Sequence, residues 1–174
     1  MLKRRNSISW NRIGIYVVIK AFGGIMLDCK KVKKIFRVVG IKGSGTFADF
    51  GTEVPKLAQQ FLTRVDEVEN NSGTEIALFE PKKDVNHLEG HYYVGVLVNE
   101  NLKEVPVGMN YFETAQSYVT TRGKIINIDH LHKQLLKWAV EQGYERDLES
   151  HIVEIYHPIE NSDEEVEIYL PIYH

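Results

Sequence analysis

Residues 151–171 read HIVEIYHPIENSDEEVEIYLP, and this stretch indicates the fold of the chain. Alternating apolar residues predict two β-strands, over 152–157 and 165–170, which are joined by the polar turn at 160–163. Successive side chains of a strand point to opposite faces, so each strand has one aliphatic face. The other face carries a carboxylate and a phenol together, Glu154 with Tyr156 and Glu167 with Tyr169.

The preceding sequence contains the same kinds of element twice. Hydrophobic periodicity predicts the order strand, helix, strand, strand in each half. The glycine-rich run 40–45 is interpreted as a turn, and Val68 is the last apolar position of the first helix. In the second helix Asp129 is the expected N-cap, and Gly143 lies near the end. The expected strands are 34–41, 75–79, 90–98 and 111–120, followed by the two strands of 151–171, and the first helix begins at Thr52 or Glu53.

The two halves are related by a nearly constant spacing. Leu78 and Ile155 are 77 positions apart, and Val94 and Ile168 are 74 positions apart. We therefore expect an α+β fold made by pseudo-two-fold duplication of a β-α-β-β unit. Its antiparallel sheets should carry two helices on one side and leave a ligand cleft between the halves on the other. The expected organisation is an N-terminal extension, 1–29, and one domain, 30–174, with halves of about 30–100 and 105–174.

The charge of the chain is unevenly distributed. Residues 1–25 contain five basic and no acidic residues, so the net charge of −3 for the whole chain leaves −8 for residues 26–174. An acidic domain repels nucleic-acid phosphates, so we expect no direct nucleic-acid binding and favour a cationic partner. A single cysteine, Cys29, excludes an internal disulfide and fits a cytoplasmic protein.

The first 27 residues resemble a signal peptide, with a basic head and an apolar run. Lys20 interrupts that run, and residues 13–27 are too few to span a bilayer. An appended element, or an extension ahead of a start at Met26, is therefore favoured over contact with a membrane.

Several short motifs together resemble the GyrI-like effector-binding domain. They are VPVGM at 105–109, QSYV at 116–119, the helix around Trp138, EIYHP at 154–158 and EIYLP at 167–171. The resemblance covers residues 30–174. This family includes domains of multidrug-sensing and AraC-type regulators, a gyrase inhibitory protein and stand-alone proteins. It implies the same duplication, with a ligand pocket at the pseudo-two-fold cleft, and a link to transcription regulation or drug response.

The resemblance also implies which residues bind the ligand. Multidrug sensors of the family carry an acid-x-apolar element and an acid-x-tyrosine element, which match Glu154 with Tyr156 and Glu167 with Tyr169. Tyr156 departs from that pattern and makes the expected pocket more aromatic. A carboxylate among aromatic rings favours a lipophilic cation as its counter-charge, and Glu154 is the expected anchor. The further expected contacts are Trp138, Tyr93, Tyr111 and Tyr118.

Other functions remain as alternatives to this small-molecule binding module. A hydrolase of the same superfamily would use Glu154 as general acid or base and Tyr156 or Tyr169 as proton donor. A gyrase-inhibitor-like protein would act through a protein partner. No metal or cofactor is expected, because Gly90 separates His87 from His91 at the start of a strand, and His130 and His132 diverge on a helix. Binding without catalysis is the favoured interpretation.

Overall fold

The computed structural model describes residues 27–160 and 163–174, so the expectations for residues 1–26 lie outside it. Apart from short 3₁₀ turns, the described elements follow the order β-α-β-β twice, which confirms the predicted α+β duplication. The strands are β1 (Lys30–Thr46), β2 (Asn71–Phe79), β3 (Glu89–Val98), β4 (Asn110–Lys124), β5 (Ile152–Pro158) and β6 (Glu164–Ile172), and the helices are α1 (Phe50–Leu62) and α2 (Ile128–Glu141).

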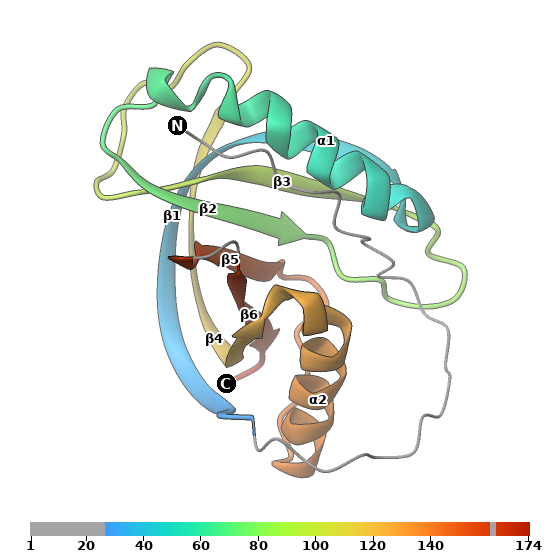
Figure 1. Cartoon of the computed structure of the whole chain (residues 1–174). Helices are drawn as coiled ribbons and strands as arrows, with labels where there is room; N and C mark the ends of the chain where they lie inside the picture. Colours follow the sequence, from blue (N-terminus) through green and yellow to red (C-terminus); the bar gives the residue numbers. More distant parts are fainter. Residues whose placement is uncertain (1–26, 161–162) are drawn as a thin grey trace.

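The described strands form one closed antiparallel sheet in the order β1-β3-β2-β5-β6-β4, in which β4 pairs back to β1. Both β1–β4 and β2–β5 join a strand of one half to a strand of the other. The long strand β1 bends so that its first part pairs with β4 and its last part with β3 (Figure 1). The two halves are therefore parts of a single sheet.

Strand pairing defines the pseudo-two-fold relation. In the first half Ile76 of β2 pairs with Gly95 of β3, and in the second half Val153 of β5 pairs with Tyr169 of β6. Equivalent positions are therefore 77 residues apart in β2 and β5, and 74 residues apart in β3 and β6. Ala77 is thus equivalent to Glu154, and the same two residues are paired directly. The pseudo-two-fold axis consequently passes through this pair.

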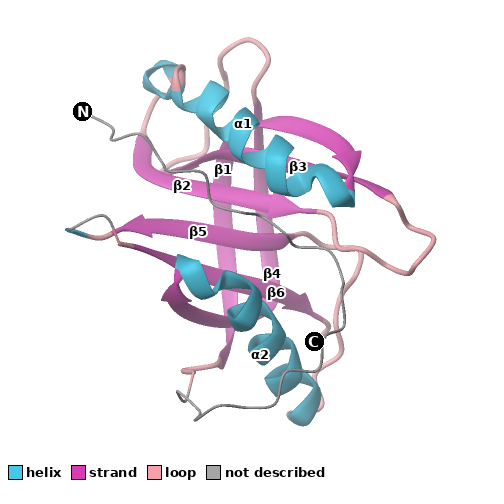
Figure 2. Cartoon of the chain, turned by 45° about the vertical axis from the view of Figure 1, so that its right-hand side comes forward, coloured by secondary structure: helices cyan, strands magenta, loops and turns pink. Residues whose placement is uncertain are grey.

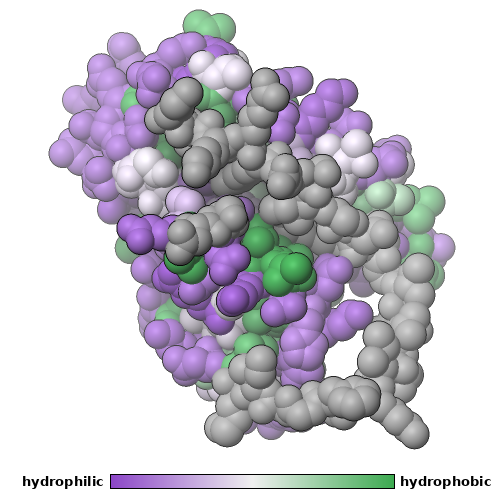
Figure 3. All heavy atoms as spheres, in the orientation of Figure 1, coloured by the Kyte–Doolittle hydropathy of each residue, from purple (hydrophilic) through white to green (hydrophobic). Residues whose placement is uncertain are grey.

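Both helices pack on the same side of the sheet, at its two ends. Helix α1 contacts β1 and β3, and α2 contacts β4 and β6, so the pair β2–β5 lies between them (Figure 2). We call this outer face of the sheet the helix side. Space-filling Figure 3 shows hydrophobic residues gathered in the middle of this view, between the two helices. Neither helix of the described residues is long and apolar enough to cross a membrane.

The opposite face of each strand points into the closed sheet, which we call the inside. Apolar side chains fill much of it, with aromatic rings of Phe36, Tyr118 and Tyr169 in mutual edge contact at 5.0–5.7 Å. A cleft of about 520 Å³ lies at one end, lined by residues of β1, β4 and β6 and so by both halves. The buried residues of this inside cluster are Phe36, Val38, Ile76, Leu78, Tyr118, Val153, Ile155 and Tyr169.

The predicted turn at 40–45 was wrong, because these residues lie within β1. Gly40 is paired with Gly95 in β3, and their backbones approach closely. A Cβ atom on Gly95 would lie 2.2 Å from the carbonyl oxygen of Val39. Glycine here permits two paired strands to approach closely and does not reverse the chain.

The helix limits also differ from the prediction. Helix α1 ends at Leu62, and Val65 begins a separate 3₁₀ turn instead of continuing the helix to Val68. The Asn71 side chain donates to the Val68 carbonyl at 2.9 Å and thereby stabilises the non-helical connection.

Helix α2 begins at Ile128, so Asp129 lies in its first turn and Asn127 is the N-cap. Its end was predicted correctly. Gly143 has φ +77°, a left-handed conformation that favours glycine, and Tyr144 N–H donates to the Ala139 carbonyl at 2.9 Å.

Candidate functional site

Glu154, at the centre of β5, is fully buried on the helix side. Its Oε1 lies 2.7 Å from His132 Nε2 of α2, and its Oε2 accepts a hydrogen bond of 2.5 Å from the Tyr156 hydroxyl. Tyr156 is 5% exposed, so this carboxylate lies in an apolar environment. Burial of a carboxylate is unfavourable unless donors or a positive charge compensate it, and here an imidazole and a phenol do so.

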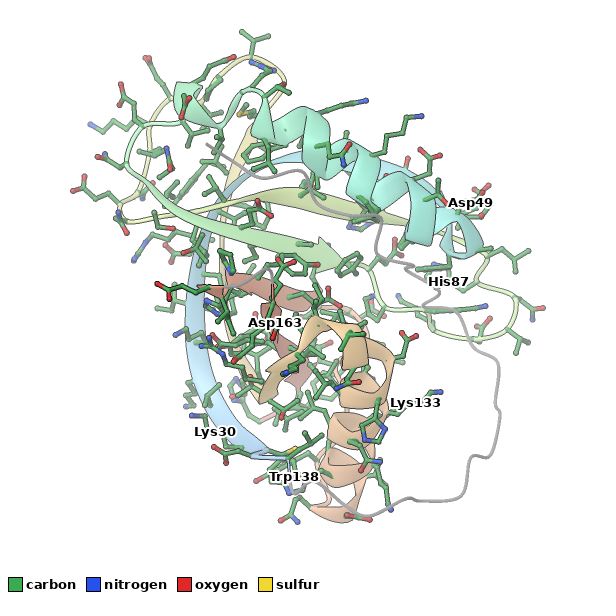
Figure 4. The ribbon with its side chains drawn as sticks, viewed as in Figure 1. Lys30, Asp49, His87, Lys133, Trp138 and Asp163 are labelled. Atoms are coloured by element: carbon green, nitrogen blue, oxygen red, sulfur yellow. The ribbon has the colours of Figure 1, made fainter. Side chains whose placement is uncertain are left out.

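Two other expected site residues lie on the same side of the sheet. Trp138 of α2 packs against the helix-side cluster and contacts Tyr144 at a ring distance of 5.9 Å (Figure 4). Tyr111, at the start of β4, also packs on this cluster, and its buried hydroxyl has no hydrogen-bond partner within the described residues. Glu154, Tyr156, Trp138 and Tyr111 therefore share the helix side.

The remaining expected residues face the inside. In the β5–β6 pairing Glu154 lies opposite Ile168, and Val153 lies opposite Tyr169. Side chains opposite each other share a face, so Glu167 and Tyr169 point away from Glu154. Tyr118 and Tyr93 belong to the inside as well. The pairing thus separates the two acid-x-tyrosine elements onto opposite faces of one sheet.

Glu167 has its own donors on the inside. Its carboxylate accepts from the Tyr169 hydroxyl at 2.6 Å and lies 2.5 Å from His157 Nε2 and 3.7 Å from Arg122 Nη1. Burial raises the pKa of Glu167, but these hydrogen bonds and positive charges outweigh it and lower the pKa overall. Burial, followed by the adjacent carboxylate, raises the pKa of Tyr169. Glu167 is therefore an anion, and Tyr169 a neutral donor.

His132 is a site residue that the sequence reasoning missed. It was considered only as a metal ligand, paired with His130. Its side chain is 23% exposed and reaches Glu154, whereas the adjacent Lys133 points away from the sheet (Figure 4). Helical periodicity could have identified it, because Leu131 and Leu135 are buried and the position after Leu131 lies beside that apolar face.

Another polar cluster connects β3 to the start of β5. His91 Nδ1 lies 2.7 Å from Glu80 Oε2, and His91 Nε2 lies 2.7 Å from His151 Nε2. If His91 donates from Nδ1 to Glu80, its Nε2 accepts a hydrogen bond from the Nε2–H of His151. Burial, followed by the neighbouring His91, lowers the pKa of His151 to about 4. Within residues 27–160 and 163–174 no group of three or more His, Cys, Asp or Glu has a geometry for a metal ion.

The duplicated fold and the buried carboxylate of Glu154 together indicate a domain that binds small molecules. A duplicated β-α-β-β domain with a buried, hydrogen-bonded carboxylate beside aromatic rings can recognise a small ligand of opposite charge. A family model described as integron-associated effector binding protein matches residues 31–172. The chain belongs to this family of effector-binding proteins, which confirms the GyrI-like assignment made from the sequence motifs.

Solved structures with the same fold have low sequence identity to the chain. SAV2435, solved with tetraphenylphosphonium bound, has a TM-score of 0.61 and 12% identity, and the match covers 86% of this chain and 94% of that one. An integron cassette protein from the mobile metagenome of Vibrio cholerae has a TM-score of 0.58 and 12% identity, with coverage of 84% and 97%. No curated protein sequence matches the chain.

The C-terminal domain of EcmrR is a third structural neighbour, with a TM-score of 0.59, 14% identity and coverage of 86% of this chain and 99% of that one. In an EcmrR–DNA complex the same fold covers 57% of the EcmrR chain. A relative of this fold thus occurs in a DNA-bound protein, and the absence of direct nucleic-acid binding by this chain stays a prediction.

Proposed function

We propose that this effector-binding protein binds amphipathic organic cations on the helix side of β2–β5, with Glu154 as the anionic anchor. The observation that carries the proposal is the complete burial of the Glu154 carboxylate between His132 and Tyr156. A buried carboxylate provides a strong, localised attraction for a positive charge, and an adjacent phenol ring adds a face for cation–π contact.

The pseudo-symmetry of the sheet supports a functional role for this acid. The equivalent position in the first half is Ala77, which is 2% exposed and faces the same side. The fold therefore accepts a small apolar residue at this point of the sheet. Because replacing a buried ion pair with apolar residues is often neutral or stabilising, an acid at position 154 is better explained by ligand binding than by stability.

The charge and shape of the ligand follow from the surroundings of Glu154. A cation with delocalised charge loses little hydration on entering an apolar site, unlike an inorganic ion. The structural neighbour SAV2435 was solved with tetraphenylphosphonium, a lipophilic cation of this kind. We propose that such cations replace the hydrogen bond from His132, because this imidazole of α2 occupies one oxygen of Glu154.

A fluorescence titration with rhodamine 6G tests the proposal. We expect saturable binding by the wild type and a loss of affinity of about 30-fold or more in Glu154→Gln, since one partner of a buried charge pair is removed. A neutral dye of similar size should bind both proteins weakly. Glu154→Gln should unfold at the same urea concentration as the wild type or a higher one, which separates lost binding from lost folding.

Glu167→Gln is the matched control. It removes the same charge from the same acid-x-tyrosine motif, but on the inside of the sheet. We expect it to bind rhodamine 6G like the wild type. Equal affinity of the wild type and Glu154→Gln for the cation would refute the anchor, and a selective loss in Glu167→Gln would move the cation site to the inside.

We further propose that the bound cation acts on transcription or drug response through a partner protein. The family is one of effector-binding proteins, and the neighbour EcmrR occurs in a DNA complex. The charge of −8 on residues 26–174 disfavours direct contact with DNA phosphates. Affinity purification of the full chain from its host, with and without rhodamine 6G, should show a partner whose recovery depends on the cation.

A further inference from the structure

The cleft of about 520 Å³ on the inside of the sheet is separate from Glu154. Its floor runs across three neighbouring strands, because Lys30 of β1 pairs with Thr120 of β4, which pairs with Tyr169 of β6. Lys30 marks the end of the molecule at which β1 begins (Figure 4). Val32 and Lys34 continue this face of β1, so the cleft combines basic side chains with the apolar Val32 and the Tyr169 ring, and its acidic lining residues are Asp28 and Glu167.

The pseudo-symmetry indicates that the fold does not require this opening. Val38 of β1 pairs with Leu97 of β3, and Tyr118 of β4 pairs with Pro171 of β6. Because Leu97 and Pro171 are equivalent, Val38 and Tyr118 are equivalent as well, and corresponding positions of β1 and β4 are 80 residues apart. The equivalents of Val32 and Glu167 at the other end are then Phe112 and Tyr93. Those two rings contact each other in a tilted arrangement, with their centroids 4.7 Å apart, and occupy that end of the inside. The end that contains the cleft has the smaller Val32 and the polar Glu167 instead, and it is open.

The charges of the cleft are unequal. Arg122 pairs with Glu165 at 2.6 Å, and Glu167 is already satisfied by Tyr169, His157 and Arg122. In contrast, Lys30 and Lys34 take part in none of the ion pairs among the described residues, although Asp28 also lines the cleft. Val32 lies between these two lysines on the same face. The basic residues of the lining (Lys30, Lys33, Lys34 and Arg122) thus outnumber its acids (Asp28 and Glu167), and two of the ammonium groups flank Val32.

We propose that this cleft is a second ligand site, which binds small aromatic anions such as carboxylates. The anionic group would lie between Lys30 and Lys34, and the aromatic body would lie over Val32 and beside the Tyr169 ring. Lysine side chains are long enough to converge on a group above the residue between them. This site lies on the opposite face of the sheet from Glu154 and selects the opposite charge, so it goes beyond the proposed cation binding.

Calorimetric titration with 2-naphthoate tests the site, with 2-naphthamide as the neutral analogue. We expect naphthoate to bind the full chain, and Lys34→Gln to weaken this binding about fivefold or more through loss of one charge contact. Lys31→Gln is the matched control, because Lys31 is on the same strand but faces outward, where its Nζ lies 5.2 Å from the Tyr144 ring. It should leave the affinity unchanged.

The proposal would be overturned if naphthoate did not bind, or if the neutral amide bound equally well. It would also be overturned by an equal loss of affinity in Lys31→Gln and Lys34→Gln, because that would indicate only a general effect of surface charge. Glu154→Gln separates the two sites. Naphthoate affinity should persist in this variant whether or not rhodamine 6G binding is lost, and abolition of naphthoate binding would show that the anion uses the Glu154 site instead.

Discussion

Two ionisable side chains, the half-buried His151 just before β5 and the fully buried Glu154 within it, illustrate two ways of keeping a polar group away from water. Glu154 has donors at both carboxylate oxygens, from α2 and from its own strand. His151 has a histidine as partner, so a positive charge on both rings would be repulsive, and burial already disfavours the first charge. Glu154 is therefore the proposed anchor for a cation, while His151 remains neutral at pH 7.

The neutral state of His151 makes the protein sensitive to acid. Its pKa is lowered from 6.5 to about 4 by burial, so the unfolded chain binds a proton first as the pH falls. The contribution of His151 to stability is constant above pH 6.5 and decreases between pH 6.5 and pH 4, by about 2 kcal/mol at pH 5. Urea unfolding of His151→Gln should lose less stability between pH 7.5 and pH 5 than the wild type. His130→Gln, at an exposed position of α2, should behave like the wild type.

At the scale of the element, the period of each strand could be predicted but the pairing of strands could not. The pattern EIY occurs at 154–156 and again at 167–169, and both strands form there. Pro158 pairs with Glu164, which sets Glu154 opposite Ile168. A connection one residue shorter would set Glu154 opposite Glu167 and unite both acids on one face. Alternation is a local property, whereas register depends on the turn, which the sequence pattern leaves undetermined.

The close approach of the paired strands β1 and β3 is a second feature that alternation cannot predict. At Gly95 a Cβ atom would lie 2.2 Å from the Val39 carbonyl oxygen and 2.8 Å from Gly40 Cα, both in backbone that cannot easily move. We expect Gly95→Ala to lower the free energy of unfolding by about 2–3 kcal/mol in urea titrations. Gly45→Ala, in the same strand pair but with nothing within 4 Å of the added atom, should change it by less than about 0.5 kcal/mol. Equal stability of the two variants would contradict such a close approach of the two strands.

At the scale of the whole molecule, the duplication could be predicted from the spacing of apolar residues, because equivalent strands of the two halves carry the same alternation. Closure of the sheet could not, since the pairings β1–β4 and β2–β5 join residues far apart in the sequence. Closure is what creates an inside, and therefore what assigns Glu154 and Glu167 to different environments. His132 was missed for a related reason, because its contact with Glu154 depends on how α2 lies on the sheet.

A closed sheet shared by both halves should unfold as one unit. Leu78 and Ile155 occupy equivalent positions of β2 and β5, and both are buried in the inside cluster. We expect Leu78→Ala and Ile155→Ala each to lower the free energy of unfolding by about 2–5 kcal/mol, since each leaves a cavity between strands of both halves. Hydrogen exchange should show the same decrease in protection for β3 and β6 in either variant. A Leu78→Ala protein in which only β2 and β3 lose protection would show instead that the halves open independently, and closure would then contribute little to cooperativity.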